Sequence, residues 1–206
     1  MEIISLEKAG SRAVERAIDV LRSGGVIIFP TETSYGLGCD PRNLAALGKI
    51  YRIKERSTSK TLPLVSCSME QVRNIFNIPK VIEELAAKYW PGPLTILLEP
   101  KDISLRHQMP VFKDGLVAIR VSSHSFVQNL ACSYNFPITA TSANMTGMAD
   151  PYSMNDLLKV YGSALANKQP DLIIDGGDLP YNPPSTIVKV DPTGKIEVIR
   201  QGAIKL

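Results

Sequence analysis

The chain reads Val26-Ile27-Ile28-Phe29-Pro30-Thr31-Glu32-Thr33-Ser34-Tyr35-Gly36-Leu37-Gly38 near its start. The first four residues are a short, mostly β-branched apolar run, which predicts a buried strand. Hydroxyl side chains and glycines follow directly, at the kind of strand end where open α/β sheets bind ligands. Thr31, Thr33 and Tyr35 alternate, so an extended backbone places them on one face. The stretch predicts either a ligand-binding strand end or a polar turn that uses the glycines for its geometry.

Helix and strand patterns alternate along the rest of the chain, which favours an α/β fold. Apolar spacing and capping signals predict helices near residues 14–24, 44–51, 68–76, 79–89, 125–134 and 153–161. Apolar runs predict strands at 26–29, 62–65, 94–98, 117–121, 138–141, 171–175, 185–190 and 197–200. Because proline has no backbone N–H to donate, Pro63 favours an edge position in the sheet for the strand at 62–65. The length of 206 residues allows one large domain or two small ones, and the mixture of hairpin-like and helical connections predicts a mixed sheet with helices packed on it.

Composition excludes several classes of protein. With 44% hydrophobic and 21% charged residues, the chain matches a globular domain rather than a disordered one. A net charge of +3 is too small to indicate a nucleic-acid-binding protein, although a protein with this net charge can still carry a local basic patch. The start lacks a signal pattern and no apolar run reaches the ~20 residues of a membrane span, so we expect a cytoplasmic protein with no membrane contact.

The cysteines and histidines argue against a metal site. Cys39, Cys67 and Cys132 are odd in number and widely spaced, which predicts buried thiols in a reducing compartment rather than a disulfide framework or a zinc site. Only two histidines are present, which disfavours a histidine metal cage. In Asp175-Gly176-Gly177-Asp178, a turn is favoured over a metal-binding loop.

The segment Lys54-Glu55-Arg56-Ser57-Thr58-Ser59-Lys60 combines cations with hydroxyls. A guanidinium offers phosphate or carboxylate a planar fork of donors, and an ammonium acts as a point charge. The alternative is a solvated basic loop. In either case the cations are expected to be exposed, so Lys54→Ala and Arg56→Ala are expected to leave the fold intact.

Three further segments place small polar or cationic residues at an end of a predicted strand. Their site candidates are Thr141, Ser142 and Asn144, then Ser185 and Arg200. Arg120 lies inside an apolar strand and needs a partner, since unpaired burial is costly. It is either an edge residue whose head reaches water or an anchor for a substrate carboxylate.

No catalytic triad or carboxylate pair is visible. The residues therefore favour a site that binds anionic substrates and stabilises developing charge. Adenylate transfer is such a reaction, because it depends mainly on positioning and on cations.

Seven motifs resemble the YrdC-like family, the L-threonylcarbamoyladenylate synthases, in its single-domain form. They are Pro30 to Gly38, Lys54-x-Arg56, Trp90-Pro91-Gly92-Pro93-Leu94-Thr95, Ile119-Arg120-Val121, Thr141-Ser142-Ala143-Asn144, Pro184-Ser185-Thr186-Ile187-Val188 and Arg200-Gln201-Gly202. The match runs in order from about residue 10 to 202. Jointly these motifs are specific, although each alone is not.

The resemblance implies a nucleotidyltransferase that converts ATP, L-threonine and bicarbonate into threonylcarbamoyl-AMP and pyrophosphate, with Mg²⁺ accompanying ATP. A partner tRNA threonylcarbamoyl transferase complex would place the product on a tRNA adenosine beside the anticodon. The resemblance implies a single domain over residues 1–206, in which helices pack on a twisted, mixed, largely open sheet that curves around a basic concave face. The family is also associated with binding double-stranded RNA and tRNA.

The resemblance also implies roles for individual residues. The ATP-binding set is Lys54, Arg56, Lys60, Ser142, Asn144 and Arg200, of which Lys54 and Arg56 would be catalytic. The threonine and bicarbonate set is Thr31, Thr33, Tyr35, Arg120, Thr141 and Ser185, with Arg120 on the threonine carboxylate.

The chain departs from the family pattern at Cys67. Many relatives have a histidine at this position, in a Pro-Leu-x-x-His pattern, and a thiol is a poor substitute for an imidazole donor. Two alternatives therefore stay open. One is an RNA-binding module that holds a helix by shape and phosphate contacts without this turnover. The other is a related adenylating enzyme that uses another amine.

Overall fold

A computed structural model describes residues 1–206. Its strands are β1 (Glu2–Ser5), β2 (Ile27–Pro30), β3 (Tyr35–Gly38), β4 (Leu64–Ser66), β5 (Leu94–Leu98), β6 (Val117–Val121), β7 (Ile138–Thr139), β8 (Thr141–Ser142), β9 (Leu172–Asp175), β10 (Thr186–Val190) and β11 (Ile196–Arg200). Its helices are α1 (Leu6–Ala9), α2 (Ser11–Arg22), α3 (Leu44–Ile53), α4 (Met69–Ile75), α5 (Lys80–Tyr89), α6 (Leu105–Gln108), α7 (Ser125–Tyr134) and α8 (Met154–Tyr161), with a 3₁₀ turn η1 (Ala166–Lys168).

The strands form two mixed sheets. The first has the order β1-β9-β2-β3-β8 and the second β11-β10-β5-β6-β4-β7. In the first, β1, β9 and β2 run parallel, and β3 and β8 are added antiparallel. In the second, the parallel pairs β10–β5 and β4–β6 are joined by the antiparallel pair β5–β6. The predicted mixed α/β architecture is confirmed, and the strands divide between two sheets.

The two sheets meet where the predicted strand 138–141 passes from one to the other. Its first half is β7 at the edge of the second sheet, and its second half is β8 at the edge of the first. The Thr139 amide donates to the Cys39 carbonyl over 3.0 Å, and the Thr139 hydroxyl accepts from the Cys39 amide over 2.8 Å. Gly38 permits this contact, because a Cβ there would lie 2.0 Å from the Thr139 carbonyl oxygen. The two sheets are therefore joined tightly at this seam.

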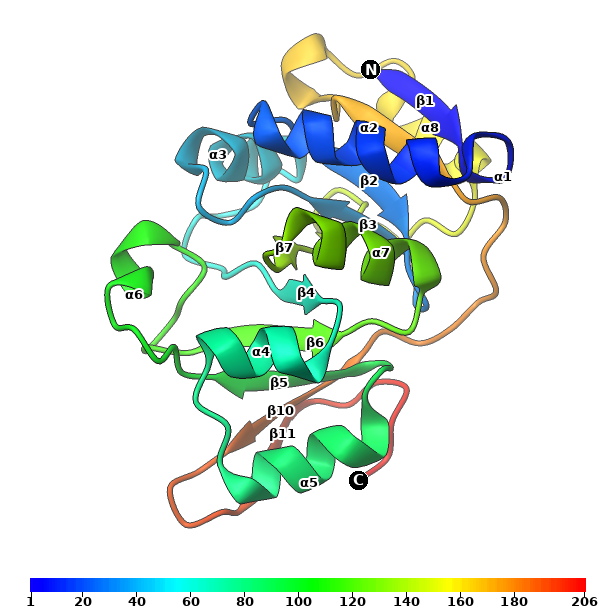
Figure 1. The fold of residues 1–206 in the computed structure, drawn as a ribbon. Coiled ribbons are helices and arrows are strands. Elements are labelled where there is room, and N and C mark those ends of the chain that lie inside the picture. The colour runs from blue at the N-terminus through cyan, green and yellow to red at the C-terminus, as the bar shows by residue number, and fades with distance from the viewer.

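Helices α2, α7, α4 and α5 are stacked on one side of the strands, from the N-terminal end of the molecule to its C-terminal end (Figure 1). Helix α2 buries Ala13, Ala17 and Leu21 against α7 and β9, in a cluster that includes Phe126. The larger core cluster lies around the central strands of both sheets. None of the helices has the length and hydropathy needed to span a bilayer.

Most predicted elements are confirmed, and their deviations are local. Pro63 does not mark an edge: β4 lies between β6 and β7, and the proline precedes its first residue. Its carbonyl still accepts a hydrogen bond, from the Ala140 amide over 2.8 Å. Ser68 caps α4, and Ser153 with Asp156 forms a complete capping box at α8. The short β1 and α1 were not predicted.

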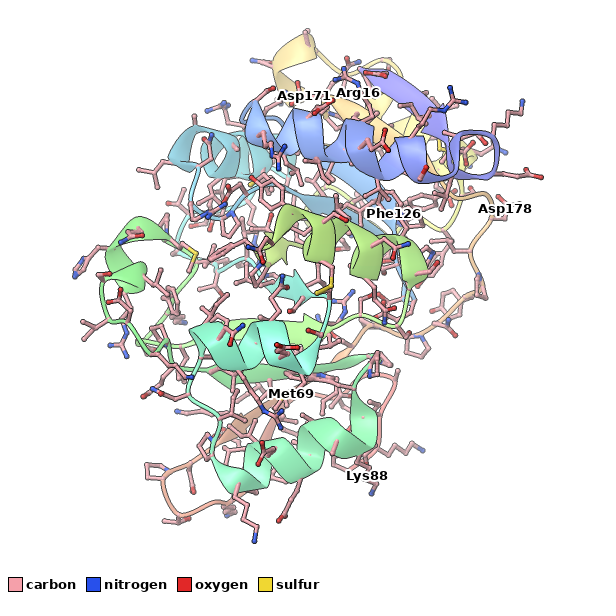
Figure 2. The ribbon with its side chains drawn as sticks, viewed as in Figure 1. Arg16, Met69, Lys88, Phe126, Asp171 and Asp178 are labelled. Atoms are coloured by element: carbon pink, nitrogen blue, oxygen red, sulfur yellow. A yellow bond between two sulfur atoms is a disulfide. The ribbon has the colours of Figure 1, made fainter.

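The prediction of three reduced thiols is wrong for two of the cysteines. Cys67 and Cys132 form a disulfide with their Cα atoms 5.3 Å apart, whereas Cys39 is a buried free thiol. Figure 2 shows the sulfur–sulfur bond between α7 and the loop before α4. The 65 residues between them hide this proximity in the sequence, because it arises only when α7 packs across β4.

Candidate functional site

A polar cavity of about 230 Å³ lies where the two sheets meet. The first sheet contributes Tyr35, Gly36, Thr141 and Ser142, and the second contributes Thr95, Ala118, Arg120, Ile187 and Arg200. Connecting segments add Thr31, Thr33, Ser34, Arg56, Thr61, Pro63, Ala140, Asp150, Pro184 and Ser185. Strand ends that are far apart in sequence therefore converge on one concavity, as α/β topology favours.

Three arginines supply the positive charge of the cavity wall. Arg120 Nε donates to Glu32 Oε1 over 2.8 Å. Arg200 Nη2 donates to the Ser185 carbonyl over 2.7 Å and to its hydroxyl over 3.1 Å. Arg56 donates to the Thr61 carbonyl over 3.1 Å, and its Nε is buried without a partner. Guanidinium donors left over by these contacts suit phosphate and carboxylate oxygens.

Arg120 is not the edge residue that one prediction allowed. Strand β6 lies inside the second sheet, between β5 and β4, and the Arg120 side chain is 7% exposed. Its required partner is Glu32, whose pKa is lowered by Arg120 and Ser122 against the raising effect of burial. Glu32 was not a predicted site residue; its place between Thr31 and Thr33 was the only signal.

The hydroxyls of the wall are oriented by local hydrogen bonds. Thr31 Oγ1 donates to the Ser34 carbonyl over 2.7 Å and accepts from the Thr33 amide over 3.1 Å. Ser185 Oγ is hydrogen-bonded to Thr95 Oγ1 over 2.8 Å. These bonds fix the orientation of hydroxyl donors and acceptors that line the cavity.

The Tyr35 hydroxyl links the wall to the segment between β9 and β10. It donates to the Gly177 carbonyl over 2.7 Å and accepts from the Gly176 amide over 2.9 Å. Burial raises the pKa of Tyr35 to about 12, so the phenol keeps its proton at neutral pH. In Asp175-Gly176-Gly177-Asp178, Asp175 is the last residue of β9, its Oδ1 accepts from the Gly177 amide over 2.9 Å, and Gly177 has a φ of 76°.

Lys54 is buried, and its side chain is not exposed to an anion in the cavity. It is 2% exposed and does not line the cavity. Its ammonium donates to the Ser142 carbonyl, to the Asn144 carbonyl over 2.8 Å and to Asn144 Oδ1 over 2.9 Å. The expectation of an exposed loop cation is wrong for Lys54, because α3 ends there and its side chain turns inward. Lys54 holds the loop after β8.

Asn144 completes this internal network and does not line the cavity either. Its Oδ1 accepts from Lys54 and from Ser142 Oγ over 2.7 Å. Its Nδ2 donates to the Met148 carbonyl over 2.5 Å and to Asp150 Oδ1 over 3.0 Å. With both ends of its amide engaged, Asn144 positions Ser142 and Asp150, which do line the cavity.

The cavity gathers nine of the predicted site residues: Thr31, Thr33, Tyr35, Arg56, Arg120, Thr141, Ser142, Ser185 and Arg200. Lys60 is exposed and lies outside it, as do Lys54 and Asn144. The wall residues that sequence reasoning missed include Thr61, Thr95 and Asp150. Thr95 belongs to a quoted motif, whereas nothing in the sequence marks Asp150. No group of three or more His, Cys, Asp or Glu side chains is placed to hold a metal.

Comparison with known proteins identifies the family of this chain. The Sua5/YciO/YrdC family model, described as telomere recombination, matches residues 19–202. The chain belongs to this family. The match includes every residue of the cavity wall.

Curated relatives of this family carry an enzyme name. The mouse threonylcarbamoyl-AMP synthase is 32% identical over 211 residues, which cover 98% of this chain and 71% of the mouse protein. The Marinobacter nauticus threonylcarbamoyl-AMP synthase is 34% identical over 166 residues, covering 74% of this chain and 85% of the relative.

Solved structures show the same fold. P. abyssi Sua5 complexed with L-threonine matches with a TM-score of 0.84 at 29% identity, covering 98% of this chain and 58% of that protein. This chain thus spans little more than half of that Sua5. E. coli YciO matches with a TM-score of 0.82 at 25% identity over 98% of this chain and 94% of YciO.

Proposed function

We propose that this protein is a threonylcarbamoyl-AMP synthase, which makes threonylcarbamoyl-AMP and pyrophosphate from ATP, L-threonine and bicarbonate. The observation that carries the proposal is the cavity between the sheets, with three arginines among hydroxyls, in a chain whose curated relatives bear that name. The product would serve threonylcarbamoyl modification of a tRNA adenosine through a partner transferase complex.

The three arginines would bind two different anionic groups, the threonine carboxylate and the phosphates of ATP. Arg120 would bind the threonine carboxylate, because its guanidinium is fixed and its two terminal nitrogens have no protein partner. Arg56 and Arg200 would face the phosphates of ATP. Holding the amine and bicarbonate together raises their effective concentration, which supplies much of the acceleration. The threonine amine displaces water from bicarbonate to form the carbamate, whose oxygen then attacks the α-phosphorus and displaces pyrophosphate.

Mg²⁺ would enter with ATP as part of the substrate. Asp150 is the one carboxylate of the cavity wall, and only its Oδ1 has a hydrogen bond, from Asn144. One carboxylate together with phosphates and waters is an ordinary ligand set for Mg²⁺. Asp150 would hold the ion there, which neutralises phosphate charge when bound.

Threonine as the amine substrate does not depend on the residue at position 67. Cys67 does not line the cavity, and its sulfur is engaged in the disulfide. We therefore expect Arg120, together with the hydroxyls of Thr31 and Thr33, to select the amino acid. The L-threonine in the P. abyssi Sua5 structure supports threonine as the amine substrate.

The test is an assay of pyrophosphate release from pure protein. Release that requires ATP, threonine and bicarbonate together supports the synthase. Release with another amino acid in place of threonine would instead favour an adenylating enzyme for a different amine. RNA binding without pyrophosphate release would favour the RNA-binding module.

A further inference from the structure

The charged guanidinium of Arg120 is buried, so water cannot fully solvate it. It lies within β6, where Val65 of β4 is its register partner, and it is 6% exposed. A buried guanidinium needs a counter-charge and hydrogen bonds in its own surroundings. The second sheet supplies neither from its own strands.

The counter-charge comes from the other sheet. Glu32, in the loop between β2 and β3, accepts Arg120 Nε on Oε1 over 2.8 Å and the Ser122 hydroxyl on Oε2. The two charged side chains are only 7% and 11% exposed. The carbonyl of Glu32 is fixed as well, because Asn182 Nδ2 donates to it over 3.0 Å. Both oxygens of the carboxylate are thus engaged away from the cavity.

This contact leaves a specific part of Arg120 for a ligand. Because Nε is bonded to Glu32, rotation of the planar guanidinium is restricted. Arg120 lines the cavity, and neither of its Nη nitrogens has a hydrogen-bond partner in the protein. A pair of parallel N–H donors with fixed orientation matches the two oxygens of a carboxylate.

We propose that Glu32, supported by Ser122, is a positioning residue that fixes the guanidinium of Arg120 for the carboxylate of the amino-acid substrate. Neither Glu32 nor Ser122 lines the cavity, so both act through Arg120. This assignment rests on the proposed function, because the carboxylate that Arg120 receives is that of the substrate threonine.

Positioning and simple charge balance predict opposite results for Glu32→Gln. If Glu32 only neutralised Arg120, its loss would leave the cavity more positive and would tighten binding of an anionic carboxylate. If Glu32 fixes the guanidinium, its loss frees Arg120 to rotate and weakens that binding. The sign of the change in threonine affinity therefore separates the two roles.

The first experiment measures threonine and ATP dependence of pyrophosphate release, and threonine binding by calorimetry. Glu32→Gln is expected to weaken threonine binding about tenfold or more and to change the KM for ATP much less. Ser122→Ala, which keeps the ion pair, should weaken threonine binding by a smaller factor. Glu2→Gln is the surface control, since Glu2 also pairs with an arginine, Arg16, but accepts both its Nε and its Nη2 and lies far more exposed. Unchanged or tighter threonine binding in Glu32→Gln overturns the proposal.

A second experiment does not depend on the stability of one variant. Guanidinium ion added at millimolar concentration should restore threonine-dependent turnover to Arg120→Ala, because Glu32 remains to hold the ion. The double variant Arg120→Ala/Glu32→Gln should not be restored, and equal rescue of both would contradict the proposal. If the wild-type protein binds threonine but releases no pyrophosphate, the proposed synthase activity is refuted. If Glu32→Gln binds threonine unchanged and turns over normally, only the proposed role of Glu32 is refuted.

Discussion

Replacing Lys54 tests whether its role is to hold the loop after β8 or to contact the nucleotide. Burial, with help from Arg56, lowers the pKa of Lys54 from 10.5 to about 8, so at pH 7 the ammonium still carries three protons for its three oxygen acceptors. Lys54→Met keeps the aliphatic stem and removes every donor. Asn144 Oδ1 retains the Ser142 hydroxyl as a donor, whereas the two carbonyls lose the ammonium.

The expected cost follows from those two carbonyls. A buried acceptor left without its donor costs about 1–3 kcal/mol, so the two carbonyls together should cost Lys54→Met about 2–6 kcal/mol of unfolding free energy. For a chain of this size, that corresponds to a fall in Tm of roughly 4–24 °C. Urea unfolding and calorimetry measure both quantities, and pyrophosphate release should fall with them.

Arg56→Ala is the comparison variant. Arg56 is half-buried, lines the cavity and makes one hydrogen bond, to the Thr61 carbonyl. Its removal should cost only about 1 kcal/mol of stability while it abolishes adenylate formation. If Lys54→Met melts with the wild type and still loses adenylate formation, Lys54 contacts the nucleotide and our interpretation of its burial is wrong.

Three further results are expected. Reducing Cys67–Cys132, or replacing both residues by serine, should cost about 4 kcal/mol for a closed loop of this length, and an unchanged urea midpoint would mean that the thiols are free in solution. Because the folded pKa of Glu32 lies below its ordinary 4.5, its stabilisation is present above pH 4.5 and lost as pH falls through the folded value. The stability gap between wild type and Glu32→Gln should therefore shrink from pH 6 to pH 3, and a constant gap would argue against the ion pair. Tyr35→Phe should lose about 1–2 kcal/mol, because its hydroxyl holds Gly176 and Gly177, and should leave the KM for threonine nearly unchanged; a large rise in that KM would mean that the phenol contacts the substrate.

The sequence was most informative where local pattern decides local structure. The apolar run before Pro30 forms β2, and the alternating hydroxyls after it reach the cavity, as a strand end predicts. Arg120 needed a partner because of its apolar flanks, and it has one in Glu32. Both inferences use only the residue and its immediate neighbours.

The sequence was least informative where long-range packing decides. Lys54 and Lys60 belong to the same basic segment, but one is buried under Asn144 and the other is exposed. No local pattern distinguishes them, because the difference arises when the loop after β8 packs on the end of α3. The same holds for Cys67 and Cys132: their wide spacing led to the prediction of reduced thiols, whereas the docking of α7 on β4 brings the two sulfurs together.

The central claim is that one cavity between the two sheets holds both the amino acid and the nucleotide. A crystal structure of the protein with L-threonine and a magnesium complex of a non-hydrolysable ATP analogue tests this directly. We predict the threonine carboxylate on the terminal nitrogens of Arg120 and the phosphates beside Arg56 and Arg200. Density for either ligand outside this cavity, or a carboxylate bound elsewhere while Arg120 keeps only Glu32, would contradict the account.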